Sequence, residues 1–142
     1  MIFNFKLNIC YPHEIKISRD LKKKVKEHEE NTELSHSVIK AVKDSDCLIT
    51  DTWFSMGKKP SSKLLKVFKP YQVNKKVMSY AKPDSIFMHC LPAKIGSEVS
   101  NDVIKGSKSI VLKQAKNTKV QYTRCLMEVY IQGRHILKHR NL

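Results

Sequence analysis

A short apolar run, Ser85–Met88, leads directly into His89, Cys90, Leu91 and Pro92. The run is rich in aromatic and β-branched residues and a proline soon follows it, so we expect a buried strand that stops at a turn. A histidine and a thiol then stand at the carboxyl end of a strand. In open α/β sheets this is the edge where ligands bind, because the connecting loops open a crevice there.

A second apolar run of the same kind spans residues 46–50 and ends in Asp51, with a polar segment continuing to Gly57. Its residues also indicate a strand that finishes in polar groups. The sequence therefore predicts two strand ends that carry side chains suited to ligand binding.

Strand and helix patterns alternate along the chain. Further strands are expected at 3–9, where apolar and polar residues alternate, at 33–35 as a short edge strand, and at 109–112. Apolar residues three or four apart predict helices at 17–30, 38–42, 64–68, 77–81, 100–104 and 122–137. Ser35 or Ser37 and Asn74 are the expected helix caps. Repeated βα units imply one α/β domain with a doubly wound, mostly parallel sheet and helices on both faces, a Rossmann-like three-layer sandwich.

The composition fits one globular domain. The chain has 142 residues, of which 41% are hydrophobic and 28% charged, enough for a core of its own. No stretch approaches the roughly 18 apolar residues that span a membrane, and the N-terminus lacks the pattern of a secretory signal, so we expect a cytoplasmic protein. The four cysteines are far apart in the sequence, which argues against disulfides and a zinc site. We expect no metal and no cofactor.

The net charge of +14 comes from 27 basic and 13 acidic residues. Such a balance can indicate a nucleic-acid partner. Here the lysines are spread over loops and polar helix faces, without the interleaved aromatic residues that stack bases. We therefore favour a solvated, lysine-rich surface over specific nucleic-acid binding, with a weak general affinity for polyanions.

Four motifs occur in an order and spacing that resemble a known family. They are Asp51–Trp53 with Ser55–Gly57, then Phe68–Asn74, then Ala81–Asp84, then Phe87–Ala93, with a weaker echo at Gln114, Ala115 and Asn117. Together they resemble the C-terminal, ornithine-binding domain of ornithine carbamoyltransferase, in the aspartate/ornithine carbamoyltransferase family. The resemblance runs from about residue 6 to 126. It implies that residues 1–142 form the amino-acid-binding domain and that the carbamoyl phosphate-binding domain is absent.

The resemblance implies roles for the residues at the two strand ends. Asp51, with Ser55 and the backbone of Met56, would bind ornithine, Asp51 holding its α-ammonium group by charge-assisted hydrogen bonding. The alternative is that Asp51 caps the next turn. Cys90 would lie beside the δ-amino group and help remove its proton, as a thiolate favoured by nearby cations. The alternative is a small, buried apolar side chain.

The remaining residues of the second motif have implied roles as well. Cys90 and Leu91 would contact carbamoyl phosphate, Leu91 through its backbone carbonyl. His89 suits a catalytic base by residue type, but the resemblance favours a positioning role for it. Pro92 is expected to fix the turn, and a cis peptide bond is one way to do so.

The chain departs from the family on the phosphate side of the reaction. Thr118 stands where the family has a phosphate-binding arginine, and Lys116 or Lys119 could supply charge without the forked geometry of arginine. The Ser-x-Arg-Thr and His-Pro-x-Gln segments of the family do not occur in this sequence. The implied reaction transfers the carbamoyl group of carbamoyl phosphate to the δ-amine of ornithine, giving citrulline and phosphate, with only the amino-acid half of the site supplied here.

Several interpretations of this half-site stay open. The chain could complete its site from neighbouring subunits, since the family usually forms trimers. It could be one half of a split enzyme whose partner chain brings the carbamoyl phosphate-binding domain; an exposed apolar stripe on a helix at 122–137 would support this. It could also be a non-catalytic remnant or an amino-acid-binding module, which the loss of arginine at Thr118 favours.

Overall fold

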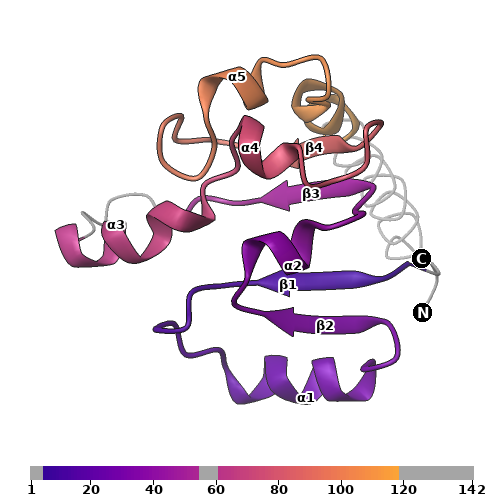
Figure 1. Cartoon of the computed structure of the whole chain (residues 1–142), viewed down its shortest axis with the longest axis vertical. Coiled ribbons are helices and arrows are strands. Elements are labelled where there is room, and N and C mark those ends of the chain that lie inside the picture. Colours follow the sequence, from indigo (N-terminus) through magenta and orange to yellow (C-terminus); the bar gives the residue numbers. More distant parts are fainter. Residues whose placement is uncertain (1–4, 55–60, 119–142) are drawn as a thin grey trace, which may run out of the picture.

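The computed structural model describes residues 5–54 and 61–118. Strands and helices alternate along these residues (Figure 1). In chain order they are β1 (Leu7–Cys10), α1 (Arg19–Glu27), β2 (Thr32–Ser35), α2 (Val38–Val42), β3 (Cys47–Thr50), α3 (Ser62–Phe68), the 3-10 turn η1 (Lys69–Tyr71), α4 (Lys75–Met78), β4 (Ile86–His89) and α5 (Asn101–Ile104). Residues 111–118 are helical as well. None of the helices described is long and apolar enough to cross a membrane.

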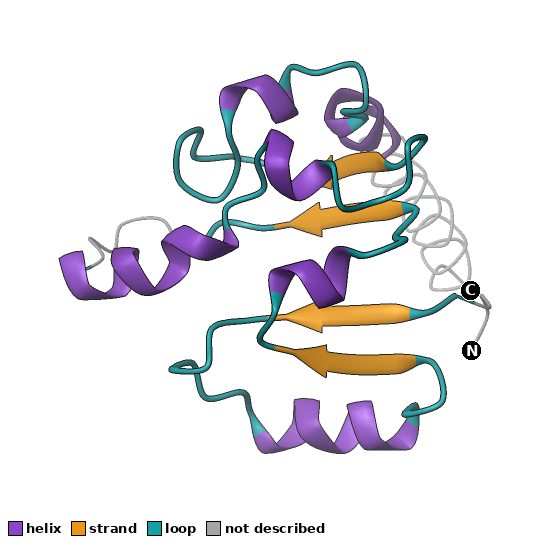
Figure 2. Cartoon of the chain, in the orientation of Figure 1, coloured by secondary structure: helices purple, strands orange, loops and turns teal. Residues whose placement is uncertain are grey.

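The four strands form two parallel pairs. β1 pairs with β2, with Leu7 opposite Thr32, and β3 pairs with β4, with Cys47 opposite Ile86. Figure 2 shows the strands pointing the same way, so their carboxyl ends share one edge. Because each parallel connection needs a crossover, the helices lie between the strands in sequence. The α/β class predicted from the sequence is confirmed.

The strand expected at 109–112 is wrong. Only Ser109 pairs, through a single parallel bridge to Phe87, and a helix begins at Val111. Of the apolar residues that suggested a strand, Val111 is buried at 4% exposure whereas Leu112 is 82% exposed. The helix therefore places one of these neighbours in the core and the other outside, which an unbroken apolar run does not reveal.

Capping side chains set where the short helices begin. The hydroxyl of Ser37 accepts the N–H of Lys40 at 3.4 Å, and the side-chain oxygen of Asn74 accepts that of Val77 at 3.0 Å. Each satisfies a backbone donor that has no partner inside the helix. Of the two caps considered for α2, Ser37 is the one used.

The core lies around β4. Phe87 and Val99 are both 0% exposed. They pack with apolar residues from β3, α4, α5, the segment before α4 and the helix at 111–118: Leu48, Val73, Val77, Met78, Val103 and Val111. Along β3, Leu48 is 6% exposed and Ile49 is 67% exposed, as expected when successive side chains point to opposite faces. This core holds the carboxyl ends of β3 and β4 in register.

Candidate active site

Asp51 and Cys90 meet at the edge where β3 and β4 end. Thr50 is opposite His89 in the parallel ladder, so the next residue of each strand emerges at the same level. The Cys90 thiol donates a hydrogen bond to Asp51 Oδ1, with 3.0 Å between sulfur and oxygen. The same oxygen accepts the backbone N–H of Thr52 at 2.6 Å. Both Asp51 and Cys90 are exposed, so a small molecule can reach them.

The hydrogen bond shifts the two acidities in opposite directions. The pKa of Asp51 is lowered, first by the hydrogen bond from Cys90 and then by that from Thr52. The pKa of Cys90 is raised, first by the hydrogen bond to Asp51, then by desolvation and the Asp51 charge. The sequence led us to expect a thiolate favoured by cations. The structure corrects this, because the group against the thiol is a carboxylate, which favours the neutral form.

His89, the last residue of β4, is buried, whereas Asp51 and Cys90 beside it are exposed. It is 1% exposed, its Nδ1 accepts the N–H of Leu91 at 2.9 Å, and its own backbone N–H donates to Gln114 Oε1 at 3.0 Å. An imidazole that accepts at Nδ1 carries its proton on Nε2 when neutral. Such a ring orients the backbone after β4, which supports a positioning role for His89 rather than that of a base.

Glu98 faces the other side of the His89 ring. The side chains of both residues are wholly buried, with 3.4 Å between His89 Nε2 and Glu98 Oε1, and Glu98 also accepts the backbone N–H of Lys94. The sequence analysis gave Glu98 no role. The only signal was an acidic residue beside the apolar Val99, and spacing alone does not show that such a residue turns inward.

The turn after Cys90 has an unusual backbone. Leu91 has a φ of 55° and the Leu91–Pro92 peptide bond is cis, as the sequence suggested for Pro92. A positive φ is uncommon for leucine, and the hydrogen bond from the Leu91 N–H to His89 holds it. The contact of the Leu91 carbonyl with a carbamoyl group stays a prediction.

Residues 93–100, which follow this turn, are held by hydrogen bonds to Gln72 and Val73, just before α4. The side-chain amide of Gln72 donates to the carbonyls of Gly96 and Ser97, each at 2.7 Å. The backbone of Val73 pairs on both sides, its N–H with the Glu98 carbonyl and its carbonyl with the Ser100 N–H, each at 2.9 Å. These bonds hold Glu98 against His89.

The remaining predictions concern residues outside the described part of the chain or outside this cluster. Ser55 and Met56 lie outside the described residues, as does the helix expected at 122–137. Thr118, where the resemblance places an arginine, uses its hydroxyl to donate to the Gln114 carbonyl at 3.0 Å. That bond serves its own helix, so the described residues show no substitute for the guanidinium there.

Asp51, His89 and Cys90 also raise the question of a metal, which the sequence gave no reason to expect. Their potential ligand atoms all lie within 4.8 Å of one another. The lone pair of His89 Nδ1 is already engaged by the Leu91 N–H, and Nε2 faces Glu98. The imidazole is therefore not free to bind an ion here, and the remaining pair, a carboxylate and a thiol, makes an incomplete site.

The thiol and the carboxylate at the carboxyl edge of the strands place this chain among the parallel α/β domains that can bind a ligand at that edge. Residues 1–129 match the family described as aspartate/ornithine carbamoyltransferase, Asp/Orn binding domain. The chain belongs to this family.

Named relatives agree with this assignment. The ornithine carbamoyltransferase of Bradyrhizobium diazoefficiens is 44% identical over 115 residues, which make up 81% of this chain and 38% of the relative. The anabolic ornithine carbamoyltransferase of Pyrococcus furiosus is 51% identical over 86 residues, or 60% of this chain and 27% of the relative. The chain thus spans well under half the length of these curated relatives.

Solved structures show the same fold. The ornithine carbamoyltransferase of Pyrococcus furiosus superposes with a TM-score of 0.71 at 40% identity, covering 80% of this chain and 38% of that one. The anabolic enzyme of Campylobacter jejuni superposes with a TM-score of 0.74 at 31% identity, covering 87% of this chain and 43% of that one. The α/β arrangement described above is therefore that of the ornithine carbamoyltransferases.

Proposed function

We propose that this chain binds ornithine and supplies the amino-acid side of a carbamoyl transfer from carbamoyl phosphate. The observation that carries the proposal is the hydrogen bond between Cys90 and Asp51 at the carboxyl edge of β3 and β4. An exposed carboxylate whose pKa is lowered stays charged at neutral pH and attracts the ammonium groups of a diamino acid. The relatives named as ornithine carbamoyltransferases support this substrate, and the anabolic ones support a place in arginine synthesis.

The chemistry requires the δ-ammonium of ornithine to lose a proton. The free amine then attacks the carbamoyl carbon, the carbon–nitrogen bond of citrulline forms, and the bond to the phosphate oxygen breaks. Cys90 and Asp51 together offer a place for the released proton, since a thiolate or a carboxylate beside the amine can accept it. An ammonium group that binds against Asp51 also weakens the effect of the carboxylate on Cys90, and the thiolate becomes easier to form.

The phosphate side of the reaction needs groups beyond those described. Transfer depends on holding the two substrates in line and on stabilising charge on the phosphate oxygens. We propose that these groups come from a carbamoyl phosphate-binding domain in a partner chain, or that lysines of neighbouring copies within a trimer replace them. Asp51, Ser55 and Met56 would bind ornithine, Cys90 and Leu91 would meet the carbamoyl group, and His89 and Pro92 would hold the turn.

A second candidate function is amino-acid binding without turnover. The observation that favours it is Thr118, whose hydroxyl is bonded within its own helix at the position where the family's arginine holds phosphate. A hydroxyl cannot replace a bidentate guanidinium.

Ornithine binding is the first test, because it needs only this chain. Isothermal titration with ornithine would be run on the unaltered chain, on Asp51→Asn and on Asp84→Asn, which removes the same charge just before β4 begins, at the other end of that strand. We expect binding that is weakened at least several-fold by Asp51→Asn alone, and no comparable binding of aspartate. Equal affinity in the three proteins would contradict the proposed site.

Turnover separates the two candidate functions. Citrulline would be measured with ornithine and carbamoyl phosphate, first with the chain alone and then with a separately produced carbamoyl phosphate-binding domain of a relative. Citrulline that requires the added domain and is lost in Cys90→Ala supports the divided enzyme. Ornithine binding with no citrulline in either mixture supports the binding module.

A further inference from the structure

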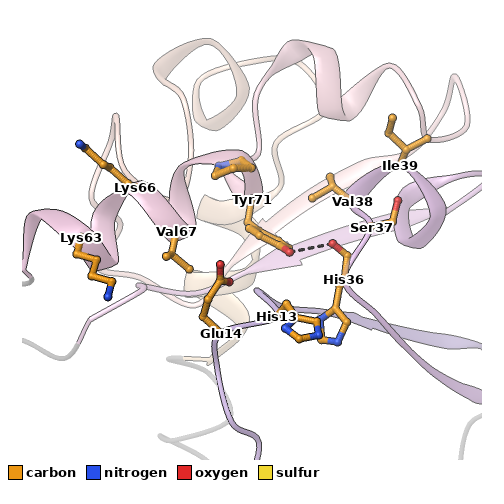
Figure 3. A pocket seen from close by; sticks show the side chains of 11 residues that line it. His13, Glu14, His36, Ser37, Val38, Ile39, Lys63, Lys66, Val67 and Tyr71 are labelled. Carbon is orange, nitrogen blue, oxygen red and sulfur yellow. Dashed lines mark hydrogen bonds between the residues drawn. The ribbon is translucent and has the colours of Figure 1, made fainter.

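A cavity of about 730 Å³ opens at the carboxyl ends of β1 and β2, apart from the Asp51 and Cys90 pair (Figure 3). His13, directly after the buried Pro12, and His36, directly after β2, both line it. Tyr71 of η1 forms another wall and donates from its hydroxyl to the His36 carbonyl at 2.8 Å. Three segments distant in the sequence therefore meet around two histidines.

The two imidazoles lie next to each other, and one of them has a fixed tautomer. The ring centres of His13 and His36 are 4.9 Å apart with the planes tilted by 55°. His36 Nδ1 is 2.8 Å from the Tyr11 carbonyl. A carbonyl can only accept, so Nδ1 carries the proton and Nε2 keeps its lone pair. A ring nitrogen bonded to a backbone carbonyl is the usual outer support of a metal-binding histidine.

The geometry points to a site for a divalent transition-metal ion, such as Zn²⁺ or Ni²⁺, held by His13 and His36 at the mouth of this cavity. An ion about 2.0–2.1 Å from a nitrogen of each ring in tetrahedral geometry places the ring centres about 5 Å apart, which matches the observed separation. Imidazole is a ligand that suits zinc, copper and nickel. Two protein ligands leave coordination positions that water would fill.

The charges around the pair decide whether a cation can stay there. Lys63 and Lys66 also line the cavity and oppose a positive ion. Glu14 also lines the cavity (Figure 3), so a carboxylate offsets part of the positive charge around the site. Glu14 follows His13 in the sequence. Lys63 and Lys66 are exposed, so water and dissolved salt weaken their repulsion of a bound cation.

The site is independent of the proposed carbamoyl transfer and can be tested without it. Two other groups of this chain could also take up metal: the Cys90 thiol, and His135 with His139, which lie four residues apart in the sequence. The reference protein for the test is therefore the full chain with Cys90→Ala and His139→Ala. Isothermal titration with ZnCl₂ and with NiCl₂ would be run on this reference and on three further variants, His13→Ala, His36→Ala and the control His28→Ala at the end of α1.

We expect one ion per chain in the reference and in the His28→Ala control. His13→Ala and His36→Ala should each weaken binding by at least about tenfold, since loss of even an outer support costs roughly 10–100-fold. In nitrogen-15 spectra of the reference, the Nε2 signal of His36 should move on adding Zn²⁺ and its Nδ1 signal should stay protonated. Circular dichroism would report whether each variant folds. The ring of His36 also contacts Tyr11, so weaker binding in His36→Ala can result from the loss of that contact. His13→Ala is therefore the decisive variant. No binding by the reference, or unchanged affinity in a folded His13→Ala protein, overturns the proposal.

Discussion

Removing the charge of Asp51 should make the Cys90 thiol more reactive. The variant is Asp51→Asn, which keeps an oxygen able to accept the hydrogen bond and removes only the negative charge. The pKa of Cys90 is raised because it donates to this carboxylate and lies beside its charge. Without that charge the thiolate is less disfavoured, and the thiolate is the form that attacks alkylating reagents.

The size of the effect follows from the distance between the two groups. Two unit charges 3.0 Å apart repel by about 1.4 kcal/mol at the dielectric constant of water, which is appropriate for exposed side chains. That energy corresponds to about a tenfold change in the thiolate population. Dissolved salt screens part of it, so at moderate ionic strength we expect Cys90 to react roughly three- to tenfold faster in Asp51→Asn near neutral pH, and more so at low salt.

The assay is alkylation with iodoacetamide over a pH series, with each cysteine followed separately by mass spectrometry of its peptide. Cys10 serves as an internal control in the same sample, since its raised pKa comes from burial and not from Asp51. Asp84→Asn is the matched control for net charge. An unchanged Cys90 rate in Asp51→Asn, or an equal increase in Asp84→Asn, would refute the electrostatic reasoning.

Three further predictions concern stability, measured by urea unfolding with the fluorescence of Trp53, the one tryptophan of the chain. Phe87→Ala should lower the free energy of unfolding by about 3–5 kcal/mol because the ring is wholly buried. The control Ile49→Ala, at a position with 67% exposure, should lower it by under about 1 kcal/mol. Equal losses in the two variants would contradict the position of the core. Asn74→Ala removes the cap of α4 and should cost about 1 kcal/mol, and an unchanged midpoint would contradict that cap. Glu98→Ala removes the acceptor of the Lys94 N–H and the carboxylate that faces the buried His89 Nε2, and should cost roughly 1–3 kcal/mol because that buried nitrogen loses its partner. It should also change the alkylation rate of Cys90, because the turn after His89 loses its support. A Cys90 rate equal to that of the unaltered chain would show that Glu98 does not act on that turn.

Much of the local structure could be predicted because the signals were local. An apolar run ended by polar residues marked β3 and β4, and Ser37 and Asn74 marked two helix starts. That Asp51 and Cys90 lie at one edge follows from parallel pairing, a rule of fold topology. The error at 109–112 also has a local cause, since three consecutive apolar residues fit a strand and a buried helix start equally well.

Other features of the site depend on contacts that the sequence does not contain. The direction of the Cys90 pKa shift is set by which charge lies against the sulfur, and residue type says nothing about that. Glu98 became part of the site only through a turn that directs its side chain inward onto His89. The histidine pair of the cavity joins residues 13 and 36, each of which looks like an ordinary surface residue when taken alone.

The hydrogen bonds that hold residues 93–100 in place should slow the exchange of amide hydrogens with solvent in this segment. The segment has neither a helix nor a long strand, a structure typical of fast exchange. Yet the amides of Gly96, Ser97 and Ser100 each donate to a backbone carbonyl, and the neighbouring Glu98 and Val99 are 0% exposed. The Gly96 and Ser97 amides are bonded within the loop, whereas opening the Ser100 amide requires the loop to leave Val73. Ser100 should therefore exchange at a rate set by unfolding of the core rather than by local fraying, and deuterium uptake would show it behaving as a strand residue.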